Sequence, residues 1–227
     1  MKVLSFNIQS DTLDYDDRLQ GILNFVNKED PDIISFQEVK YGSYKTIIKS
    51  LCSQSVKYFI LDKRVEYGRL YGELMFSKYP IKDSSYVSFN VSNNQRGLTS
   101  YFIEKNGEEV LVCTTHLDIG KQQSKQIKQI QKEIDKSKRV ILLGDFNFFD
   151  DEQSFDEQSF NEQSFLEMKD CNVGGTYTYV DDKYKSRPDR IYYKGFKKKN
   201  FITYDLKLSD HKCISASLKC CSLLNEQ

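Results

Sequence analysis

Short apolar runs that each lead into polar residues constrain this chain more than any other feature of its sequence. Arg139–Leu143 (RVILL) is almost continuously apolar and leads directly into Gly144-Asp145-Phe146-Asn147. A run of this kind is typical of a central strand that is covered on both faces. Val3–Ile8 and Asp32–Phe36 have the same character, and the second of them leads into Gln37-Glu38. The pattern therefore predicts buried sheets whose strand ends carry chemically active side chains.

Helical periodicity appears between these runs. Apolar residues recur at helical spacing within 19–26, 44–51 and 127–134, and in the third segment the other face consists of Lys and Gln. Further strand candidates are Tyr58–Leu61, Glu73–Ser77, Tyr86–Val91, Leu98–Glu104, Val110–Thr115, Asp189–Lys194 and Lys212–Leu218. Strands outnumber helices and hairpin-like pairs dominate. This predicts the α/β class, as a four-layer α/β sandwich of two packed, mostly antiparallel β-sheets flanked by helices.

The length of 227 residues fits one domain with a substantial core. We expect a single domain over residues 1–219 and a C-terminal tail over 220–227. Residues 151–165 are of low complexity, since they read DEQSF-DEQSF-NEQSF. Exposed loops accept such insertions at little cost, so the repeat fits a neutral expansion. Because it directly follows the Asp145 segment, the alternative is a loop that contacts substrate.

Composition bears on several classes of protein. Thirty-three basic residues balance 33 acidic ones, so any nucleic-acid-binding basic patch has to be local. The six cysteines show no zinc-type spacing, which favours reduced thiols in an intracellular protein. The first residues contain no apolar signal core, and no stretch approaches the length of a membrane span. We therefore expect an intracellular protein, nuclear or cytoplasmic and not secreted, that is monomeric and has no membrane partner.

Both histidines of the chain follow apolar strand-like runs, His116 after VLVCTT and His211 in Ser209-Asp210-His211. Carboxylate and amide side chains stand at other strand ends, at Asn7, Glu38, Asp145, Asn147 and Asp189. Because the strand ends of a sandwich converge on one edge, these side chains are predicted to form one site. Each also has an ordinary structural explanation, as a helix cap, a turn residue or a surface ion pair.

Six segments resemble, in order, the motifs of the endonuclease/exonuclease/phosphatase superfamily. They are Ser5-Phe6-Asn7-Ile8, Phe36-Gln37-Glu38-Val39, Thr115-His116-Leu117, Gly144-Asp145-Phe146-Asn147, Pro188-Asp189-Arg190-Ile191 and Ser209-Asp210-His211. Each motif alone is weak, but together they span residues 5–211 in the order that the family has. The resemblance implies a metal-dependent phosphodiesterase that uses Mg²⁺, with Mn²⁺ as a substitute.

The chemistry of phosphodiester hydrolysis explains these residue types. The reaction needs a hard cation, a positioned water and donors aimed at the charge that develops on the phosphate oxygens. By resemblance, Glu38 is the principal metal ligand, with Asn7 and Asp210 near the metal. Asp145 would orient and deprotonate the attacking water, and Asn147 would help hold that water or the phosphate.

The resemblance also implies roles for both histidines. His116 and His211 would donate hydrogen bonds to the non-bridging phosphate oxygens. Asp189 would pair with His211 and keep its ring protonated. Glu73 is a candidate for the same role beside His116.

Three positions bear on the branch of the superfamily. Tyr179 stands where the 5′-tyrosyl-DNA phosphodiesterase-like branch places an aromatic residue, which would stack on a terminal base or a leaving group; the alternative is strand packing. Arg96 precedes a strand as in small bacterial members, where the arginine faces the site, and is a candidate phosphate contact. Gln9 departs from the branch, which has Asp there, and cannot supply charge to a metal.

The resulting hypothesis is a Mg²⁺-dependent enzyme that hydrolyses 5′-tyrosyl-DNA adducts or other DNA ends, so that its partner is a nucleic acid, protein-linked or not. One alternative is a general endonuclease or exonuclease. Another is a phosphatase or phosphodiesterase acting on a small molecule or a lipid headgroup, and a third is an inactive binding module. Steep weakening with salt would distinguish an enzyme of nucleic acid from one of small molecules.

Overall fold

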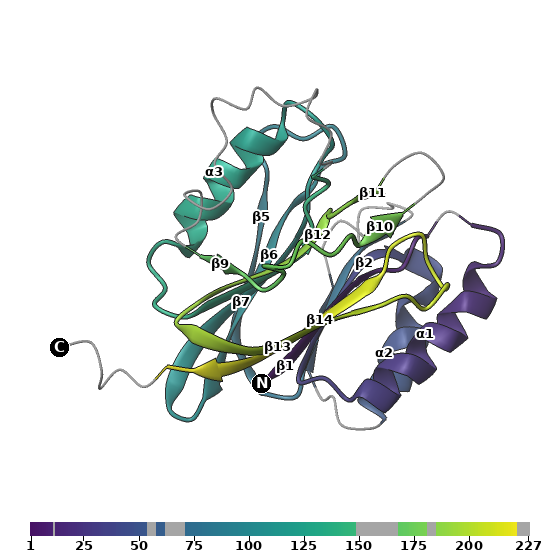
Figure 1. The fold of residues 1–227 in the computed structure, drawn as a ribbon, viewed down its shortest axis with the longest axis horizontal. Coiled ribbons are helices and arrows are strands. Elements are labelled where there is room, and N and C mark those ends of the chain that lie inside the picture. The colour runs from purple at the N-terminus through teal and green to yellow at the C-terminus, as the bar shows by residue number, and fades with distance from the viewer. Residues whose placement is uncertain (11, 54–57, 62–70, 149–167, 181–184, 222–227) are drawn as a thin grey trace.

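The buried apolar residues form three clusters, and these clusters separate four layers. In the computed structural model, which describes residues 1–10, 12–53, 58–61, 71–148, 168–180 and 185–221, two six-stranded sheets pack face to face. The cluster between the sheets includes Val3, Met75, Val112, Ile141 and Ile214. The other two clusters lie between one sheet and its covering helices. Figure 1 shows the helices on the outside of the paired sheets, which confirms the predicted four-layer α/β sandwich.

Each sheet is mixed but mostly antiparallel. The first sheet has the order β13 (Phe196–Tyr204), β14 (Cys213–Cys220), β1 (Lys2–Asn7), β2 (Ile33–Lys40), β4 (Tyr71–Ser77) and β3 (Tyr58–Leu61). The second has the order β5 (Ile81–Ser88), β6 (Gly97–Lys105), β7 (Glu108–His116), β8 (Val140–Asp145), β12 (Asp189–Lys194) and β9 (Lys169–Asp170). The short strands β10 (Tyr179–Val180) and β11 (Lys185–Ser186) pair with each other. Only β1–β2 and β7–β8 are parallel among these pairs of described strands.

The helices cover the sheets with the faces that periodicity predicts. α1 (Tyr15–Glu29) and α2 (Tyr44–Cys52), which follows the short 3₁₀ turn η1 (Tyr41–Ser43), cover the first sheet. α3 (Gln123–Ile134) covers the second sheet through its three buried isoleucines. α1 ends two residues before Pro31, and the following Asp30 is left-handed at φ 46°.

Two strand predictions need correction. β5 begins at Ile81 and ends at Ser88, whereas the sequence favoured Tyr86–Val91; as an edge strand it has mostly exposed or half-buried residues and a weak apolar signal. β13 was not predicted, because Lys197–Lys199 obscures its strand character. β13 is an edge strand of the first sheet, and its Lys197 and Lys199 are exposed, as lysines on an edge strand commonly are.

Other expectations have different outcomes. The DEQSF repeat at 151–165 lies outside the described residues. β14 extends to Cys220, so the proposed domain end at residue 219 stays a prediction. All six cysteines are free thiols, which agrees with the expectation that they are reduced. Within the described part of the chain, no helix has the length and apolar character needed to span a bilayer.

Strand register brings the polar strand ends to one edge of the sandwich. In the first sheet, Asn7 at the end of β1 is level with Gln37 of β2. In the second sheet, Asp145 at the end of β8 is level with His116 on one side and with Asp189 on the other. Parallel pairs place their carboxyl ends together, so the two sheets contribute to a common site.

Candidate active site

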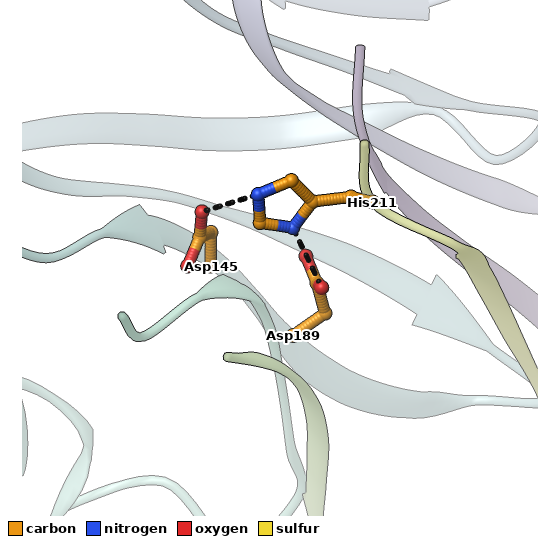
Figure 2. A group of neighbouring side chains, drawn as sticks. All are labelled: Asp145, Asp189 and His211. Carbon is orange, nitrogen blue, oxygen red and sulfur yellow. Dashed lines mark hydrogen bonds and ion pairs between the residues drawn. The ribbon is translucent and has the colours of Figure 1, made fainter. Parts of the chain in front are cut away.

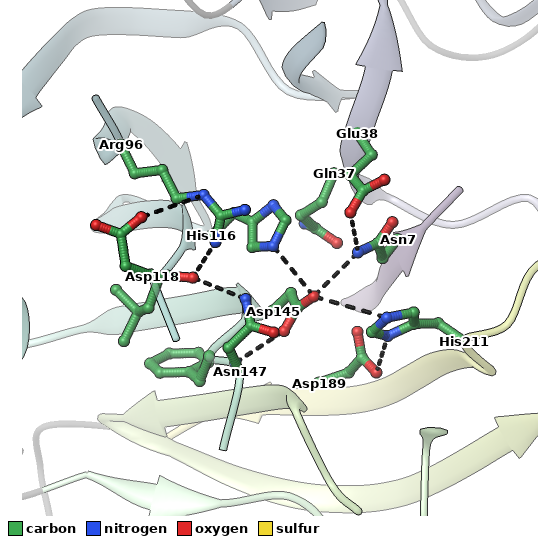
Figure 3. Close-up of polar contacts among 12 residues, drawn as sticks. Asn7, Gln37, Glu38, Arg96, His116, Asp118, Asp145, Asn147, Asp189 and His211 are labelled. Carbon is green, nitrogen blue, oxygen red and sulfur yellow. Dashed lines mark hydrogen bonds and ion pairs between the residues drawn. The ribbon is translucent and has the colours of Figure 1, made fainter. Parts of the chain in front are cut away.

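The buried carboxylate of Asp145 is the centre of the site. Its Oδ2 accepts a hydrogen bond from Asn7 Nδ2 at 3.0 Å and lies 3.3 Å from His116 Nε2 and 3.8 Å from His211 Nε2. Its Oδ1 accepts the Asn147 N–H at 2.8 Å. Figure 3 shows these groups arriving from different strands. The structure therefore brings together residues that are up to about 200 positions apart in the sequence, as the strand-end argument predicted.

His211 is held between two carboxylates. Its Nδ1 lies 2.9 Å from Asp189 Oδ2, and its Nε2 faces Asp145 (Figure 2). Burial lowers the pKa of His211, but the charges of Asp189 and Asp145 and the hydrogen bond to Asp189 outweigh burial and raise it to about 10. The ring is therefore an imidazolium at neutral pH, with both nitrogens acting as donors.

Asp145 has the opposite balance of effects. Burial raises the pKa of Asp145 to about 6, although the His211 charge and the hydrogen bonds from Asn7 and Asn147 favour its ionised form. A carboxylate with a pKa close to neutrality is suited to accept a proton during a reaction and to release it afterwards. This suits Asp145 to the role of general base that its motif implies.

The oxygens and nitrogen of Asp145, Asp189 and His211 all lie within 4.8 Å of one another, a spacing that a metal ion would also fit. A histidine must be neutral to ligate a metal, because its proton occupies the lone pair that the metal needs. The two carboxylates hold His211 in the protonated form. The trio therefore fits an ion-paired histidine better than a set of metal ligands.

Glu38 and Asp210 fit a hard divalent cation better. The half-buried Glu38 carboxylate accepts hydrogen bonds from Asn7 Nδ2 at 3.2 Å and from the Ser10 N–H at 3.1 Å. The Asp210 side chain is exposed, and its backbone N–H donates to Gln9 Oε1 at 3.3 Å, which connects it to the loop after Asn7. Carboxylate oxygens at a solvent-accessible position suit Mg²⁺, which keeps several of its waters. These two residues would hold the ion.

Asn7 connects the candidate metal ligand to the candidate base. Its Oδ1 accepts the Gln9 N–H at 3.0 Å, so its Nδ2 faces both Glu38 and Asp145. In this arrangement Asn7 braces the two carboxylates rather than offering its oxygen to a metal. Gln9, in place of the acid of the tyrosyl-DNA branch, contacts Asp210 through its side-chain oxygen.

Three non-glycine residues of the site have left-handed backbones. They are Gln9 at φ 49°, Glu38 at φ 58° and Asn147 at φ 51°. Glu38 lies where β2 and β4 lose register between Phe36 and Val39, so the predicted strand end is a bulge that re-aims the side chain. Such conformations cost about 1–2 kcal/mol each and persist where surrounding contacts impose them.

Arg96 lies next to Asn147 through a shared acceptor. The Arg96 guanidinium and Asn147 Nδ2 both donate to the backbone carbonyl of Leu117, the latter at 2.7 Å. Arg96 Nε also lies 3.7 Å from Asp118 Oδ1, and Figure 3 shows this pair on the His116 and Asn147 side of the site. Arg96 is thus at the site, where the sequence placed it, and its contact with phosphate stays a prediction.

Tyr179 borders His211. Its ring packs edge-on against His211, with centroids 5.3 Å apart at 63°, and the two residues form a β-bridge. The half-buried ring thus has strand packing and a place at the site at the same time, which accommodates both interpretations of this residue. Glu73 is buried on β4, and its pairing with His116 stays a prediction.

Sequence reasoning missed two glutamines beneath the site. Gln123 Nε2 donates to the carbonyls of Phe146 and Asn147 at 2.9 and 2.7 Å, and so holds the left-handed turn. Gln126 Nε2 donates to Asp118 at 2.9 Å. Both residues are 1% exposed, although the sequence places glutamines on the polar face of this helix, opposite the isoleucines. Their spacing continues the buried isoleucine face by one turn, and this was the available signal.

A two-sheet α/β sandwich with a carboxylate, two histidines and acidic strand ends at one edge is the arrangement of a hydrolase of phosphate esters. The sequence matches the family described as Endonuclease/Exonuclease/phosphatase family over residues 4–211. The chain belongs to this family.

Relatives of known identity are similar over most of this chain. Tyrosyl-DNA phosphodiesterase 2 of Danio rerio is 26% identical over 162 residues, which cover 67% of this chain and 42% of that protein. This chain thus matches less than half of the curated relative. A humanized form of Danio rerio TDP2 has a TM-score of 0.79 at 18% identity, and coverage is 96% of this chain and 98% of that one. Danio rerio TDP2 complexed with single strand DNA product has a TM-score of 0.77 at 19% identity, over 96% and 98%.

Proposed function

We propose that this protein is a Mg²⁺-dependent phosphodiesterase that acts on DNA ends, with 5′-tyrosyl-DNA adducts as its substrate. One observation carries the proposal: the Asp145 carboxylate lies within 3.8 Å of both histidine Nε2 atoms, while Asp189 braces the second of these rings. A base and two donors are thereby aimed at a common point, as in-line attack of water on a phosphate requires.

Each residue has a role in this chemistry. A divalent ion at Glu38 and Asp210 would supply positive charge to the phosphate oxygens. Asp145 takes a proton from the attacking water as the new P–O bond forms and the bond to the leaving oxygen breaks. His116 and His211 donate hydrogen bonds to the non-bridging oxygens, where charge develops.

Asn147 and Arg96 complete the phosphate side of the site. Asn147 holds the attacking water or the phosphate, and its N–H fixes Asp145. Arg96 supplies a permanent positive charge beside Asn147, and both are anchored on the same backbone carbonyl. A guanidinium is well matched to phosphate oxygens.

The choice of substrate rests on similarity and on Tyr179. The curated relative is a tyrosyl-DNA phosphodiesterase, and one solved relative carries a single-stranded DNA product. Tyr179 packs against His211 at the edge of the site, where an aromatic ring would stack on a terminal base or on a tyrosyl leaving group.

The test is release of tyrosine from a 5′-tyrosyl oligonucleotide in the presence of Mg²⁺. The wild type should release tyrosine, and Asp145→Asn and His211→Ala should abolish the release while the variants remain folded by circular dichroism. Cleavage of unmodified duplex DNA without tyrosine release would instead assign the protein to the nuclease branch. Absence of turnover on every phosphodiester, with no metal bound, would favour an inactive binding module.

The balanced charge favours a second candidate, hydrolysis of a small-molecule or lipid-headgroup phosphoester. The chain has 33 basic and 33 acidic residues, whereas an enzyme of nucleic acid usually has an excess of basic residues along its substrate. Rates on a tyrosyl oligonucleotide and on a small phosphodiester, measured over a range of salt, distinguish the two. Activity on DNA should weaken steeply with salt because counterions compete for the phosphates.

A further inference from the structure

One arginine of α1 joins the two segments that carry the candidate metal site. Arg18 lies in the first turn of α1, and its side chain is 10% exposed. Its Nη1 donates to the backbone carbonyls of Ile8, at 3.2 Å, and of Leu208. Its Nη2 donates to the carbonyl of Gln9 at 2.7 Å. Ile8 and Gln9 follow Asn7, and Leu208 precedes Ser209-Asp210, so one guanidinium spans both segments.

The remaining donors of Arg18 are used as well. Nη2 also donates to Thr12 Oγ1, and Nε donates to Asp14 Oδ1 at 3.0 Å. All five N–H groups of the fork are thus engaged. The next turn of α1 also packs closely against this segment. The Leu208 side chain lies so near Gly21 that a Cβ atom added to this glycine would be 3.0 Å from Leu208 Cδ1. Figure 1 shows α1 beside the segment that joins β13 to β14.

The two bridged segments have few backbone hydrogen bonds to the sheets: the Ile8 N–H donates to the Gln37 carbonyl at 3.1 Å, and the chain then leaves the β1–β2 ladder. β1 ends at Asn7, and residues 205–210 lie between β13 and β14. Each segment contains a left-handed residue, Gln9 at φ 49° and Lys207 at φ 56°. Backbones of this kind persist where other contacts impose them. The hydrogen bonds from Arg18 to the carbonyls of Gln9 and Leu208 are contacts that can impose these conformations.

Two further hydrogen bonds join the same segments. Ser209 Oγ donates to the carbonyl of Asn7 at 2.7 Å, and the Asp210 N–H donates to Gln9 Oε1 at 3.3 Å. Asn7 in turn braces Glu38. These hydrogen bonds and the carbonyl contacts of Arg18 together fix the segment that braces Glu38 against the segment that carries Asp210. Arg18 contributes most of these contacts.

We propose that Arg18 is a positioning residue that sets the affinity of the divalent-metal site by fixing the Asn7–Gln9 segment against the Leu208–Asp210 segment. The inference rests on the proposed function, because it concerns a cation held by Glu38 and Asp210. Lysine cannot replace the arginine, since an ammonium lacks the planar fork that reaches three carbonyls at once.

The test is direct binding of Mn²⁺ to the full-length protein by isothermal titration calorimetry. Arg18→Lys keeps the charge and removes the fork, and its dissociation constant for Mn²⁺ should rise about tenfold, as is usual when a contact that orients a ligand is lost. The Mg²⁺ concentration for half-maximal activity should rise by the same factor. kcat at saturating Mg²⁺ should equal that of the wild type, because the catalytic groups are unchanged.

Arg139→Lys is the matched control. Arg139 is 4% exposed, donates to the carbonyl of Cys221 at 3.1 Å and pairs with Glu108 at 2.8 Å. It directly precedes β8, whereas Asp145 is the last residue of that strand, so the two lie at opposite ends of β8. Both substitutions remove a buried arginine fork and should lower the melting temperature, but only Arg18→Lys should weaken Mn²⁺ binding.

Several outcomes would overturn the proposal. One is wild-type Mn²⁺ affinity in folded Arg18→Lys, and another is an equal loss of affinity in both arginine variants. Should Arg18→Lys not fold, Ser209→Ala removes one bond between the same segments, and unchanged Mn²⁺ binding in that variant would be equally decisive against it. A wild type that binds no Mn²⁺ contradicts the proposed function itself, before any variant is compared.

Discussion

His211 Nδ1 lies 2.9 Å from Asp189 Oδ2, while the other nitrogen of the same ring faces Asp145. The first carboxylate sets the charge of the ring, and the ring in turn stabilises the ionised form of the second carboxylate. A proton donor and a proton acceptor are thus maintained side by side at neutral pH, the separation of roles that acid–base catalysis needs.

The first prediction concerns the protonation of His211. In metal-free protein, the ring should stay protonated at neutral pH and lose its proton only as pH rises toward the raised pKa of about 10. Asp189→Asn removes the adjacent charge, so the pKa should fall toward the ordinary value of about 6.5. NMR titration measures this, because the chain has two histidines and His116→Gln assigns the signals. An ordinary pKa for His211 in the wild type would refute the pairing.

The second prediction concerns the left-handed backbone of Asn147, at φ 51°. Asn147→Gly and Asn147→Ala both remove the side-chain bond to Leu117, so they should lose activity to the same extent. They should differ in stability, because only alanine incurs the left-handed penalty of about 1 kcal/mol. Urea unfolding should therefore show the glycine variant to be the more stable. Equal free energies of unfolding would mean that the turn relaxes when the side chain is removed.

The third prediction concerns how Arg96 is held. Asp118 lies 3.7 Å from Arg96 Nε and accepts the Asn93 N–H at 2.8 Å, so it fixes the turn that carries the arginine. Asp118→Asn should raise KM about fivefold, equivalent to about 1 kcal/mol, with kcat unchanged. In an Arg96→Ala background it should have no further effect, because the group that it positions is gone.

Asp32→Asn provides the control for this third experiment. Asp32 accepts the Lys2 N–H at 2.7 Å at the amino end of β2, far along the strand from Glu38. It should change stability without changing KM. Additive effects of Asp118→Asn and Arg96→Ala on KM would show that Asp118 does not act through the arginine.

The fourth prediction concerns stability at acid pH. Hydrogen bonds from Lys2 and Tyr204 hold the pKa of Glu29 below its ordinary range. A lowered folded-state pKa stabilises the protein above the ordinary carboxylate pKa, and this contribution is lost as pH falls through the lowered value. Glu29→Gln should therefore be less stable than the wild type at pH 7 by about 1 kcal/mol, and the two should converge in acid. Denaturation curves across pH measure the difference.

Glu133→Gln is the control for the acid-stability experiment. Glu133 is exposed on α3, so its substitution should leave the difference from the wild type small at every pH. A constant destabilisation of Glu29→Gln from neutral to acid pH would contradict the assignment of the effect to ionised Glu29.

Local sequence determined much of the fold. Continuous apolar runs predicted β1 and β8, and helical spacing predicted α1, α2 and α3, because these signals depend on neighbours along the chain. Edge strands were harder to predict. β13 was missed, since a strand with one paired side tolerates a run of three lysines that periodicity assigns to solvent.

The residue types at the strand ends also followed from the sequence, including Glu38, His116, Asp145, Asp189 and His211. Only the tertiary structure decided how they meet. It determines that Asp145 Oδ2 faces the histidine rings and that Asn7 directs its amide nitrogen toward Asp145. It also determines that Arg18 and Gln123 bond the backbone carbonyls of the loops that carry the site. These contacts join segments distant in the chain, and their geometry depends on strand register and left-handed turns. No local pattern encodes such distances, because they arise only when the two sheets pack.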